Sequence, residues 1–156
     1  MTERHPRKVA IIGHAKEKFT PETEEIARHI IRHILSRERD IILVSGRSPM
    51  GGIDVWAEEE ADRLGVPKRI FAPKQHSWGG EYGFRARNID IAKYSDEVHI
   101  ILVSEYPPGY KGMRFDYCYH CAEAGCPDPR SHVKSGACWT GHLARKMGKK
   151  VVWHII

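Results

Sequence analysis

Short apolar runs alternate along the chain with longer segments in which apolar residues recur every three to four positions. Runs of the first kind are typical of buried strands, and the recurring spacing is typical of an amphipathic helix. Strands are therefore expected at residues 8–13, 41–44, 69–72, 97–103 and 150–155. Helices are expected between them, at residues 21–35, 53–64, 82–93 and 140–147.

Residues at the ends of these segments support the helix boundaries. Thr20 followed by Pro21 is typical of a helix start, because the hydroxyl caps a free backbone N–H and proline lacks the one that would be unpaired. The glutamates in the next turn oppose the helix dipole favourably. Gly65 and Gly148 follow the last apolar positions of two other helices, where glycine commonly ends a helix.

The alternation of strands and helices predicts one α/β domain spanning residues 1–156. Strands joined by helices lie parallel, and the right-handed crossover rule predicts a three-layer, doubly wound, Rossmann-like sheet in the order 3-2-1-4-5. In such a sheet, ligands bind at the carboxyl ends of the strands, where the winding reverses. We therefore expect a crevice formed by residues 13–14, 45–47 and 103–104.

Composition and charge narrow the class of protein. The 156 residues are 41% hydrophobic and 29% charged, as in ordinary globular proteins, and no apolar run is long enough to cross a membrane. The charged amino-terminal segment is not followed by the apolar core of a signal peptide, so we expect a cytoplasmic protein. The net charge of +5 favours anionic partners, although basic and acidic residues are interleaved. A nucleotide suits this charge as well as a nucleic acid does.

A glycine-rich turn follows the second expected strand. Gly46, Gly51 and Gly52 let a ligand approach the backbone, and the helix beginning at Ile53 has free N–H groups in its first turn that attract anions. Arg47 adds a fork of donors suited to phosphate or carboxylate. The turn is a candidate phosphate-binding loop, and the alternative is a connection that binds nothing.

All four cysteines lie in a segment with little periodicity, residues 104–138. A stretch of that length without regular structure is unusual inside a compact domain unless another interaction orders it. Cys118 and Cys121 have the spacing of a metal-binding pair, and His132 with Cys138 completes a tetrahedral donor set for a structural zinc ion. We therefore expect a small metal-binding insertion here.

Other assignments of these cysteines stay open. Cys126 can replace His132 and make the donor set entirely thiolate. A redox pair lacks the strand-to-helix context of such motifs, whereas free thiols are ordinary in a reducing cytosol. We interpret His120 and His142 as surface or helix-end residues and do not count them as ligands.

Three stretches of the chain together resemble one known superfamily. They are residues 45–54 (SGRSPMGGID), the pair Arg87 and Asn88 ahead of residues 95–96, and residues 135–141 (SGACWTG) at the last helix. With them the chain resembles the SLOG superfamily. These are Rossmann-like domains related to the Lonely Guy phosphoribohydrolases, the DNA-processing protein of natural transformation, and a YspA- or YpsA-like branch. The likeness covers most of the chain outside the cysteine segment.

The resemblance implies that the crevice binds a nucleotide or a nucleotide-derived ligand. The two glycine-containing loops would hold phosphate and ribose, and the pair at 87–88 would face the same pocket. The ligand-binding residues expected on this basis are Gly13, His14, Ser45, Gly46, Arg47, Gly51, Gly52, Asp54, Arg87, Asn88, Ser135, Gly136, Thr140 and Gly141.

One departure from the superfamily bears on catalysis. Hydrolase members carry a glutamate in the motif PGGxGTxxE, and this chain has Leu143 at that position. Because cleavage of an N-glycosidic bond needs a carboxylate, an enzyme built on this chain would use Asp54, Asp90 or Asp116 instead. Each of them also suits a quieter role, Asp54 as a charge at a helix start and the other two as surface residues.

Three functions are compatible with these features. The first is binding or sensing of a nucleotide-like ligand, and the second is hydrolysis of an N-glycosidic or phosphoribosyl bond. The third is binding of single-stranded nucleic acid, which the positive charge and the DNA-processing relatives favour. Trp78 and Trp139 suit either stacking on a base or packing at the rim. Trp56 is a candidate for a dimer face, so a second copy of the chain is a further candidate partner.

Overall fold

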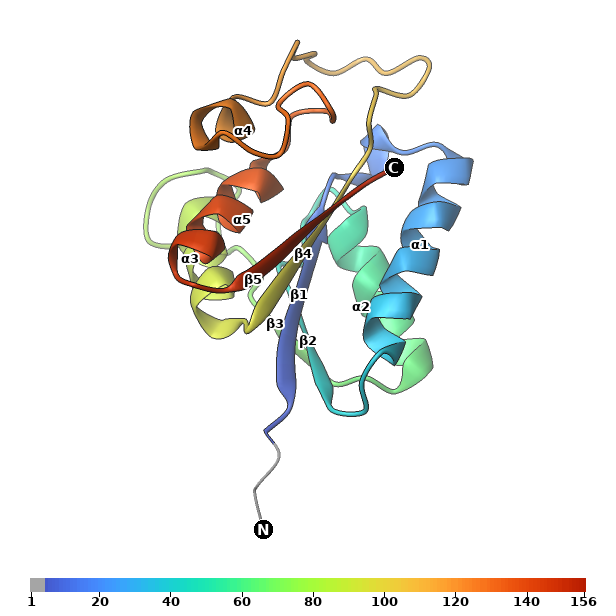
Figure 1. The fold of residues 1–156 in the computed structure, drawn as a ribbon, viewed down its shortest axis with the longest axis vertical. Helices are drawn as coiled ribbons and strands as arrows, with labels where there is room; N and C mark the ends of the chain where they lie inside the picture. The colour runs from blue at the N-terminus through green and yellow to red at the C-terminus, as the bar shows by residue number, and fades with distance from the viewer. Residues whose placement is uncertain (1–4) are drawn as a thin grey trace.

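The computed structural model describes residues 5–156 and has a five-stranded sheet at its centre (Figure 1). Every neighbouring pair of strands is parallel, and the order is β3-β2-β1-β4-β5. The strands are β1 (Arg7–Gly13), β2 (Ile41–Ser45), β3 (Lys68–Ile70), β4 (Glu97–Leu102) and β5 (Lys150–Ile155). The predicted fold class and strand order are confirmed.

Helices cover both faces of the sheet. In Figure 1, α1 (Pro21–Ser36) and α2 (Ile53–Leu64) lie on the right of the sheet, and α3 (Phe84–Tyr94) and α5 (Gly136–Lys146) lie on the left. Two short elements, η1 (Lys16–Lys18) and α4 (Tyr119–Ala124), lie near the carboxyl ends of the strands. Among the described residues, no helix is both long and apolar enough to cross a lipid bilayer.

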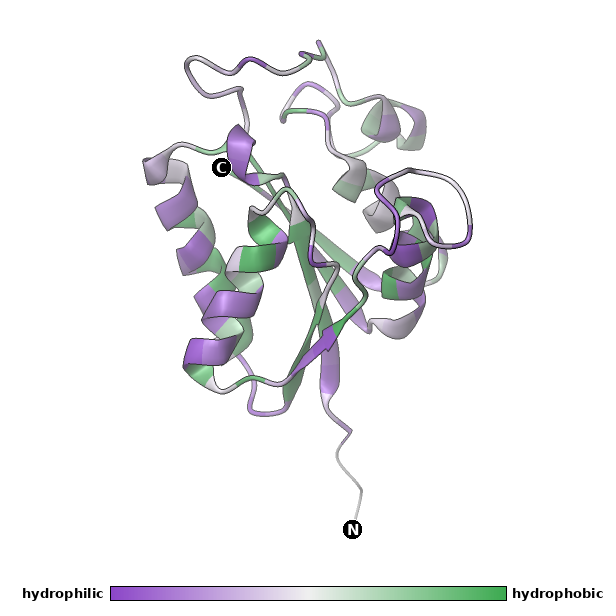
Figure 2. Cartoon of the chain, turned by 180° about the vertical axis from the view of Figure 1, so that it is seen from behind, coloured by the Kyte–Doolittle hydropathy of each residue, from purple (hydrophilic) through white to green (hydrophobic). Residues whose placement is uncertain are grey.

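The core consists of two apolar clusters, one on each face of the sheet. Successive side chains of a strand point to opposite faces. Val9 and Ile11 accordingly pack with α1 and α2, whereas Ala10 and Ile12 pack on the side of α3 and α5. Figure 2 shows the resulting pattern, in which a hydrophobic sheet lies between helices whose outer surfaces are hydrophilic.

Several element boundaries differ from those expected. Strand β3 covers residues 68–70 rather than 69–72, and α3 begins at Phe84 rather than near residue 82. Helix α5 begins at Gly136 rather than Thr140, because the Ser135 side chain caps it by accepting a hydrogen bond from the Ala137 N–H at 3.1 Å. The cysteine segment contains one helix, α4, that the hydrophobic pattern did not predict.

Trp56 lies in the core, and the expectation that it forms a dimer face is wrong. Only 4% of Trp56 is exposed, and its ring packs edge-to-face against Phe19 with the centroids 4.8 Å apart. The guanidinium of Arg28 lies over the other part of the ring, 5.5 Å from the centroid. The surface of Trp56 is therefore buried within this chain and is not free to contact a second copy.

Candidate functional site

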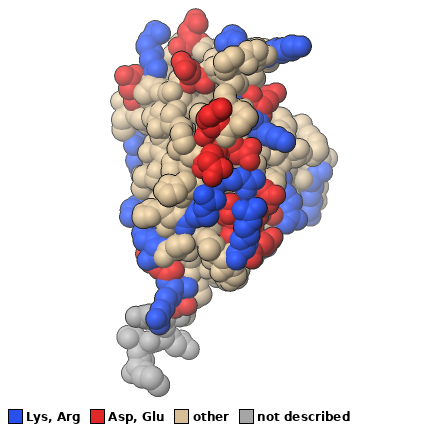
Figure 3. Space-filling model, turned by 90° about the vertical axis from the view of Figure 1, so that its right-hand side faces the viewer, with Lys and Arg blue, Asp and Glu red and all other residues tan. Residues whose placement is uncertain are grey.

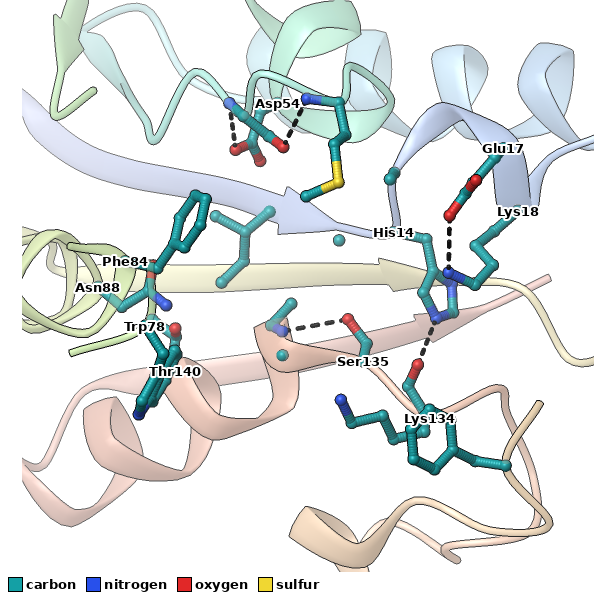
Figure 4. Close-up of a pocket in the computed structure, with 18 of the residues that line it drawn as sticks. His14, Glu17, Lys18, Asp54, Trp78, Phe84, Asn88, Lys134, Ser135 and Thr140 are labelled. Carbon is teal, nitrogen blue, oxygen red and sulfur yellow. Dashed lines mark hydrogen bonds and ion pairs between the residues drawn. The ribbon is translucent and has the colours of Figure 1, made fainter. Parts of the chain in front are cut away.

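A pocket opens at the carboxyl ends of the central strands, where the fold predicts a ligand site. Its volume is about 350 Å³, within the range of small-molecule sites. Figure 4 shows side chains from the β1 end, α2, α3 and α5 converging on it. Eight of the expected ligand-binding residues line the pocket: Gly13, His14, Asp54, Arg87, Asn88, Ser135, Gly136 and Thr140.

The other expected residues lie around the pocket without lining it. Ser45 is buried and donates a hydrogen bond to Glu58 at 2.8 Å, and Arg47 forms an ion pair with the same carboxylate at 2.8 Å. The Arg47 guanidinium, which was expected to bind a ligand, is therefore directed toward α2 and already paired with Glu58. The backbone carbonyl of Gly46 accepts a hydrogen bond from Arg87.

Several glycines in the expected set serve close packing, among them Gly52 and Gly141. Gly52 has φ +86°, and a Cβ there would lie 2.3 Å from the carbonyl oxygen of His14, so only glycine fits where this loop crosses the end of β1. A Cβ on Gly141 would lie 2.2 Å from the Ile100 side chain, which shows how tightly α5 packs on the sheet. Gly51 also belongs to the expected set and lies in the loop outside the pocket lining.

Asp54 and Arg87 face each other at one wall of the pocket. The guanidinium Nη1 lies 4.0 Å from the Asp54 Oδ2, and that oxygen also accepts the Ser48 N–H at 3.1 Å. Burial raises the pKa of Asp54 to about 6, although the charge of Arg87 opposes the shift. Asp54 is thus a buried carboxyl group that titrates near neutrality, whereas Asp90 and Asp116 are exposed and do not line the pocket.

His14 connects three parts of the chain at the floor of the pocket. Its Nδ1 accepts the Val103 N–H at 3.1 Å, so its Nε2 carries the proton and donates to the carbonyls of Val133 at 3.0 Å and Lys134 at 3.2 Å. Burial lowers the pKa of His14 to about 4, which keeps the ring neutral. Both ring nitrogens are engaged by the backbone, so His14 positions the segment that leads into α5.

The start of α5 forms a polar corner of the pocket. Ser135 caps the helix, and a side chain added at Gly136 would meet open space, so the first turn is accessible from the pocket. The ammonium group of Lys134 lies 4.9 Å from the Phe115 ring centroid, and that of Lys18 lies 5.0 Å from the centroid of Tyr110. Lys134 directly precedes the helix cap Ser135, where an anion is favoured. Lys18 lines the same pocket, and its ammonium group also forms an ion pair with Glu17 at 3.6 Å (Figure 4).

Two buried polar groups in the pocket wall have no hydrogen-bond partner in the described part of the chain. They are the hydroxyl of Thr140, whose residue is 1% exposed, and the Nε of Arg87. Buried polar groups are normally paired, and leaving one unpaired costs about 1–3 kcal/mol. Asn88 lines the same wall with an amide that can both donate and accept.

Aromatic and apolar side chains form the remaining walls. Phe84 and Trp78 flank the side of the pocket near α3, and the Trp78 ring packs edge-to-face against Trp139 with the centroids 5.0 Å apart (Figure 4). The opposite wall carries side chains that sequence reasoning missed: Tyr106, Tyr110, Met113 and Phe115. The aromatic and basic composition of residues 106–115 was the available signal for this wall.

A second group of chemically reactive side chains lies beneath α4. Cys118, Cys121, His132 and Cys138 are all buried, and their donor atoms lie within 4.8 Å of one another. The His132 Nε2 is 3.5 Å from the Cys121 sulfur and 3.6 Å from the Cys138 sulfur. These four residues could hold a metal ion. Cys126 is exposed and lies outside the group, so the structure favours the set that includes His132.

Hydrogen bonds outside this cluster orient its donors. The Ser131 hydroxyl donates to the Asp128 carbonyl at 2.6 Å, so it accepts from the His132 Nδ1 at 2.9 Å. The Nε2 lone pair of His132 then points toward the sulfurs, as metal-binding histidines require. His142 lies beside the cluster, where its Nε2 donates to the Cys121 sulfur at 3.3 Å.

The pKa values of the three cluster thiols also suit binding of a cation. Hydrogen bonds from the thiols of Cys121 and Cys138 lower the pKa of Cys118. The hydrogen bond to Cys118 raises the pKa of Cys121 to about 12, and hydrogen bonding to Cys118 and Cys121 also raises the pKa of Cys138. A bound metal ion favours the deprotonated form of all three thiols.

The parallel 3-2-1-4-5 sheet with a pocket at its carboxyl edge is a Rossmann-like fold, as the resemblance to the SLOG superfamily leads one to expect. Two solved structures of the molybdenum cofactor carrier protein of Chlamydomonas reinhardtii share this fold. One matches with a TM-score of 0.59 and 15% identity over 96% of this chain and 76% of that chain. The other matches with a TM-score of 0.57 and 18% identity over 98% of this chain and 79% of that chain. The sequence matches no family model and no curated protein.

Proposed function

We propose that the pocket binds a nucleotide or a nucleotide-derived small molecule and that the chain acts as a binding or sensing module. The observation that carries this proposal is the meeting, in one cavity, of the start of α5, two lysines (Lys134 and Lys18) and the unpaired polar groups of Thr140 and Arg87. The helix start and the lysines suit phosphate, and the unpaired groups suit the polar edge of a ring or a sugar.

The two ends of the pocket suit the two ends of such a ligand. Phosphate is expected at the first turn of α5, between Lys134 and Lys18, because free N–H groups and ammonium groups both favour negative charge there. The base or another heteroaromatic ring is expected between Phe84 and Trp78, where the Asn88 amide can pair with its edge. The pocket volume of about 350 Å³ suits a ligand of that size.

Binding without turnover fits the residues better than hydrolysis. Leu143 stands where hydrolase relatives carry a glutamate. The matched solved structures are those of a molybdenum cofactor carrier protein, and that name describes a carrier rather than a hydrolase. A carrier or sensor needs affinity and selectivity for its ligand, and it needs no assembled acid and base.

Titration calorimetry with AMP, ADP-ribose and the molybdenum cofactor tests the proposal. We expect saturable binding of at least one of them, weakened by Lys134→Ala through loss of the phosphate contact. Lys146→Ala, at an exposed position near the end of α5, is the matched control and should bind normally. A folded sample that binds none of these ligands would count against the proposal.

Hydrolysis of an N-glycosidic bond is the second candidate, and the buried carboxyl group of Asp54 favours it. A general acid with a pKa of about 6 is suited to donate a proton near neutral pH. Incubation with nucleoside monophosphates should then release free base, and Asp54→Asn should abolish the release. Asp90→Asn, on the exposed face of α3, should leave it unchanged. Absence of any released base would exclude this activity for those substrates.

We also propose that the cysteine cluster binds zinc in a structural role. Cys118, Cys121, His132 and Cys138 provide three sulfur donors and one imidazole, all of them buried, and structural zinc sites are closed by four protein ligands. Elemental analysis should find one zinc ion per chain. Cys118→Ser should lose it, and Cys126→Ser should retain it. Another metal, or none, in protein purified without chelators would contradict the assignment.

A further inference from the structure

The metal-binding cluster and the pocket share one stretch of backbone. Pocket-lining residues 134–137 lie between two members of the cluster, His132 and Cys138. The aromatic wall at residues 106–115 runs from the end of β4 to Cys118, another member. A metal ion at the cluster would therefore anchor the pocket wall on both sides.

Within the fold, this wall has little other support. Between the end of β4 and α5 the only helix is the six-residue α4, and few backbone hydrogen bonds hold the rest. One of them joins the Cys118 N–H to the Pro129 carbonyl at 2.8 Å. Long segments without regular structure lose much conformational entropy when they are ordered, and they open easily. A cross-link between their ends reduces that cost.

His14 transmits the position of the cluster to the pocket floor. It donates to the carbonyls of Val133 and Lys134, the two residues directly after the cluster member His132. The Val133 N–H donates in turn to the Val103 carbonyl at 3.0 Å, at the end of β4. A shift of His132 would therefore move Lys134 and the first turn of α5, where the phosphate is proposed to bind.

We propose that metal occupancy of the cluster controls the affinity of the pocket for its ligand. The metal ion orders residues 104–137. This ordering holds the start of α5, where phosphate is proposed to bind, and the aromatic wall in position. This inference rests on the proposed ligand-binding function, but its structural half can be tested without any ligand. Because coupling between two sites is reciprocal, a ligand in the pocket should also slow release of the metal ion.

Hydrogen exchange tests the structural half. Wild-type protein loaded with Zn²⁺ is compared with the same protein stripped by a chelator under reducing conditions. Amides of residues 104–117 and 133–137 should exchange at least about tenfold faster after stripping. Amides of β1, β2 and α2 should keep their protection. Unchanged exchange at 133–137 would overturn the inference, and so would loss of protection throughout the sheet, because the metal ion would then support the whole fold.

Calorimetry with AMP as the probe tests the functional half. AMP should bind the stripped protein at least about fivefold more weakly than the Zn²⁺-loaded protein, and saturating AMP should slow transfer of Zn²⁺ to a chromogenic chelator by a similar factor. Equal binding to both forms would overturn the coupling and leave the proposed function intact. If AMP binds neither form, the proposed function fails for this probe and the exchange experiment alone decides the inference.

Variants at His14 separate the coupling from the metal ligands themselves. His14 is not a member of the cluster, yet His14→Ala should speed Zn²⁺ release at least about fivefold because it frees the backbone next to His132. His14→Gln, which keeps a donor, should restore part of the slow release. Cys126→Ser should release Zn²⁺ as the wild type does. Wild-type release from His14→Ala would overturn the proposed path through His14.

Discussion

The two faces of the sheet are stabilised in different ways. On the side of α1 and α2, buried charge is paired within the chain: Glu60, which is fully buried, accepts hydrogen bonds from Arg28, Arg32 and Arg63. Figure 3 shows the interleaved positive and negative side chains over this face. On the other side lie the four buried polar atoms without partners among the described residues, which belong to Arg87, Ser95, Thr140 and Trp153.

The difference shows in which half of the molecule the buried polar groups are paired by the chain itself. The α1–α2 side is regular, and its polar groups are satisfied by neighbouring side chains. The pocket side, formed by β4, β5, α3, α4, α5 and residues 103–135, has unpaired polar atoms, clustered thiols and a long irregular segment. Native proteins rarely tolerate such features unless something occupies the site. The proposed ligand and the proposed metal ion would both bind in this half.

Removal of a cluster thiol should have the largest effect and should reach only the pocket side. Cys138→Ser removes a fully buried donor of the cluster, and we expect a loss of about 4 kcal/mol or more in the free energy of unfolding. Cys126→Ser, at the exposed thiol, should change stability by less than about 0.5 kcal/mol. Denaturant unfolding followed by circular dichroism measures both. Equal stability of the two variants would show that the cluster contributes nothing.

Two buried carboxyl groups, Asp54 at the start of α2 and Glu97 at the start of β4, should respond to pH with opposite sign. Burial raises the pKa of Asp54, in the pocket wall, from 3.8 to about 6, so the folded state binds the proton more tightly and stability falls as pH rises from about 4 to 6. The contribution amounts to about 3 kcal/mol. Burial alone would also raise the pKa of Glu97. Hydrogen bonds from Arg7, Arg37 and His99 outweigh the effect of burial and lower the pKa of Glu97 to about 2.

Glu97 should therefore stabilise the fold above about pH 4.5 and lose that contribution as the pH falls toward 2. Asp54→Asn should flatten the stability curve between pH 4 and 6, and Glu97→Gln should flatten it below pH 4.5. Denaturant midpoints measured across pH 2–7 distinguish the two. If Asp54→Asn runs parallel to the wild type over that range, the raised pKa is refuted.

Removing the Glu60 carboxylate tests how much the paired charges stabilise the α1–α2 side. Glu60→Gln leaves three arginines without their shared carboxylate, and because those side chains are partly exposed we expect a loss of about 2–3 kcal/mol. Glu59→Gln is the matched control, since it removes one half-exposed ion pair with Arg28 and should cost less than about 1 kcal/mol. Thermal unfolding measures the difference, and equal costs would mean that Glu60 is no more important than a surface charge.

The smallest expected effect is also the most diagnostic for the pocket. Thr140→Val removes the unpaired hydroxyl at nearly constant shape, so we expect a gain of about 0.5–1 kcal/mol in stability together with weaker ligand binding. Thr23→Val removes a hydroxyl that is engaged in the capping box of α1 and should cost about 1 kcal/mol. A destabilised Thr140→Val protein would show that its hydroxyl is already satisfied.

Sequence periodicity was sufficient for the architecture. The apolar runs and helix caps predicted every strand and the four long helices, and the crossover rule predicted the order of the sheet, because these features depend on local spacing and chirality. The boundary of α5 was missed because its first turn contains small and sulfur-bearing residues, whose helical state depends on the Ser135 cap.

The sequence by itself determined the fold class, the carboxyl edge at which ligands are expected, and the segment whose cysteines and histidines are candidates for binding a metal ion. Only the tertiary structure chose His132 over Cys126, turned Arg47 away to Glu58, and placed His14 between the pocket and the cluster. The physical reason is range. Periodicity and capping act between residues a few positions apart, whereas the partner of a side chain is decided by packing between segments distant along the chain.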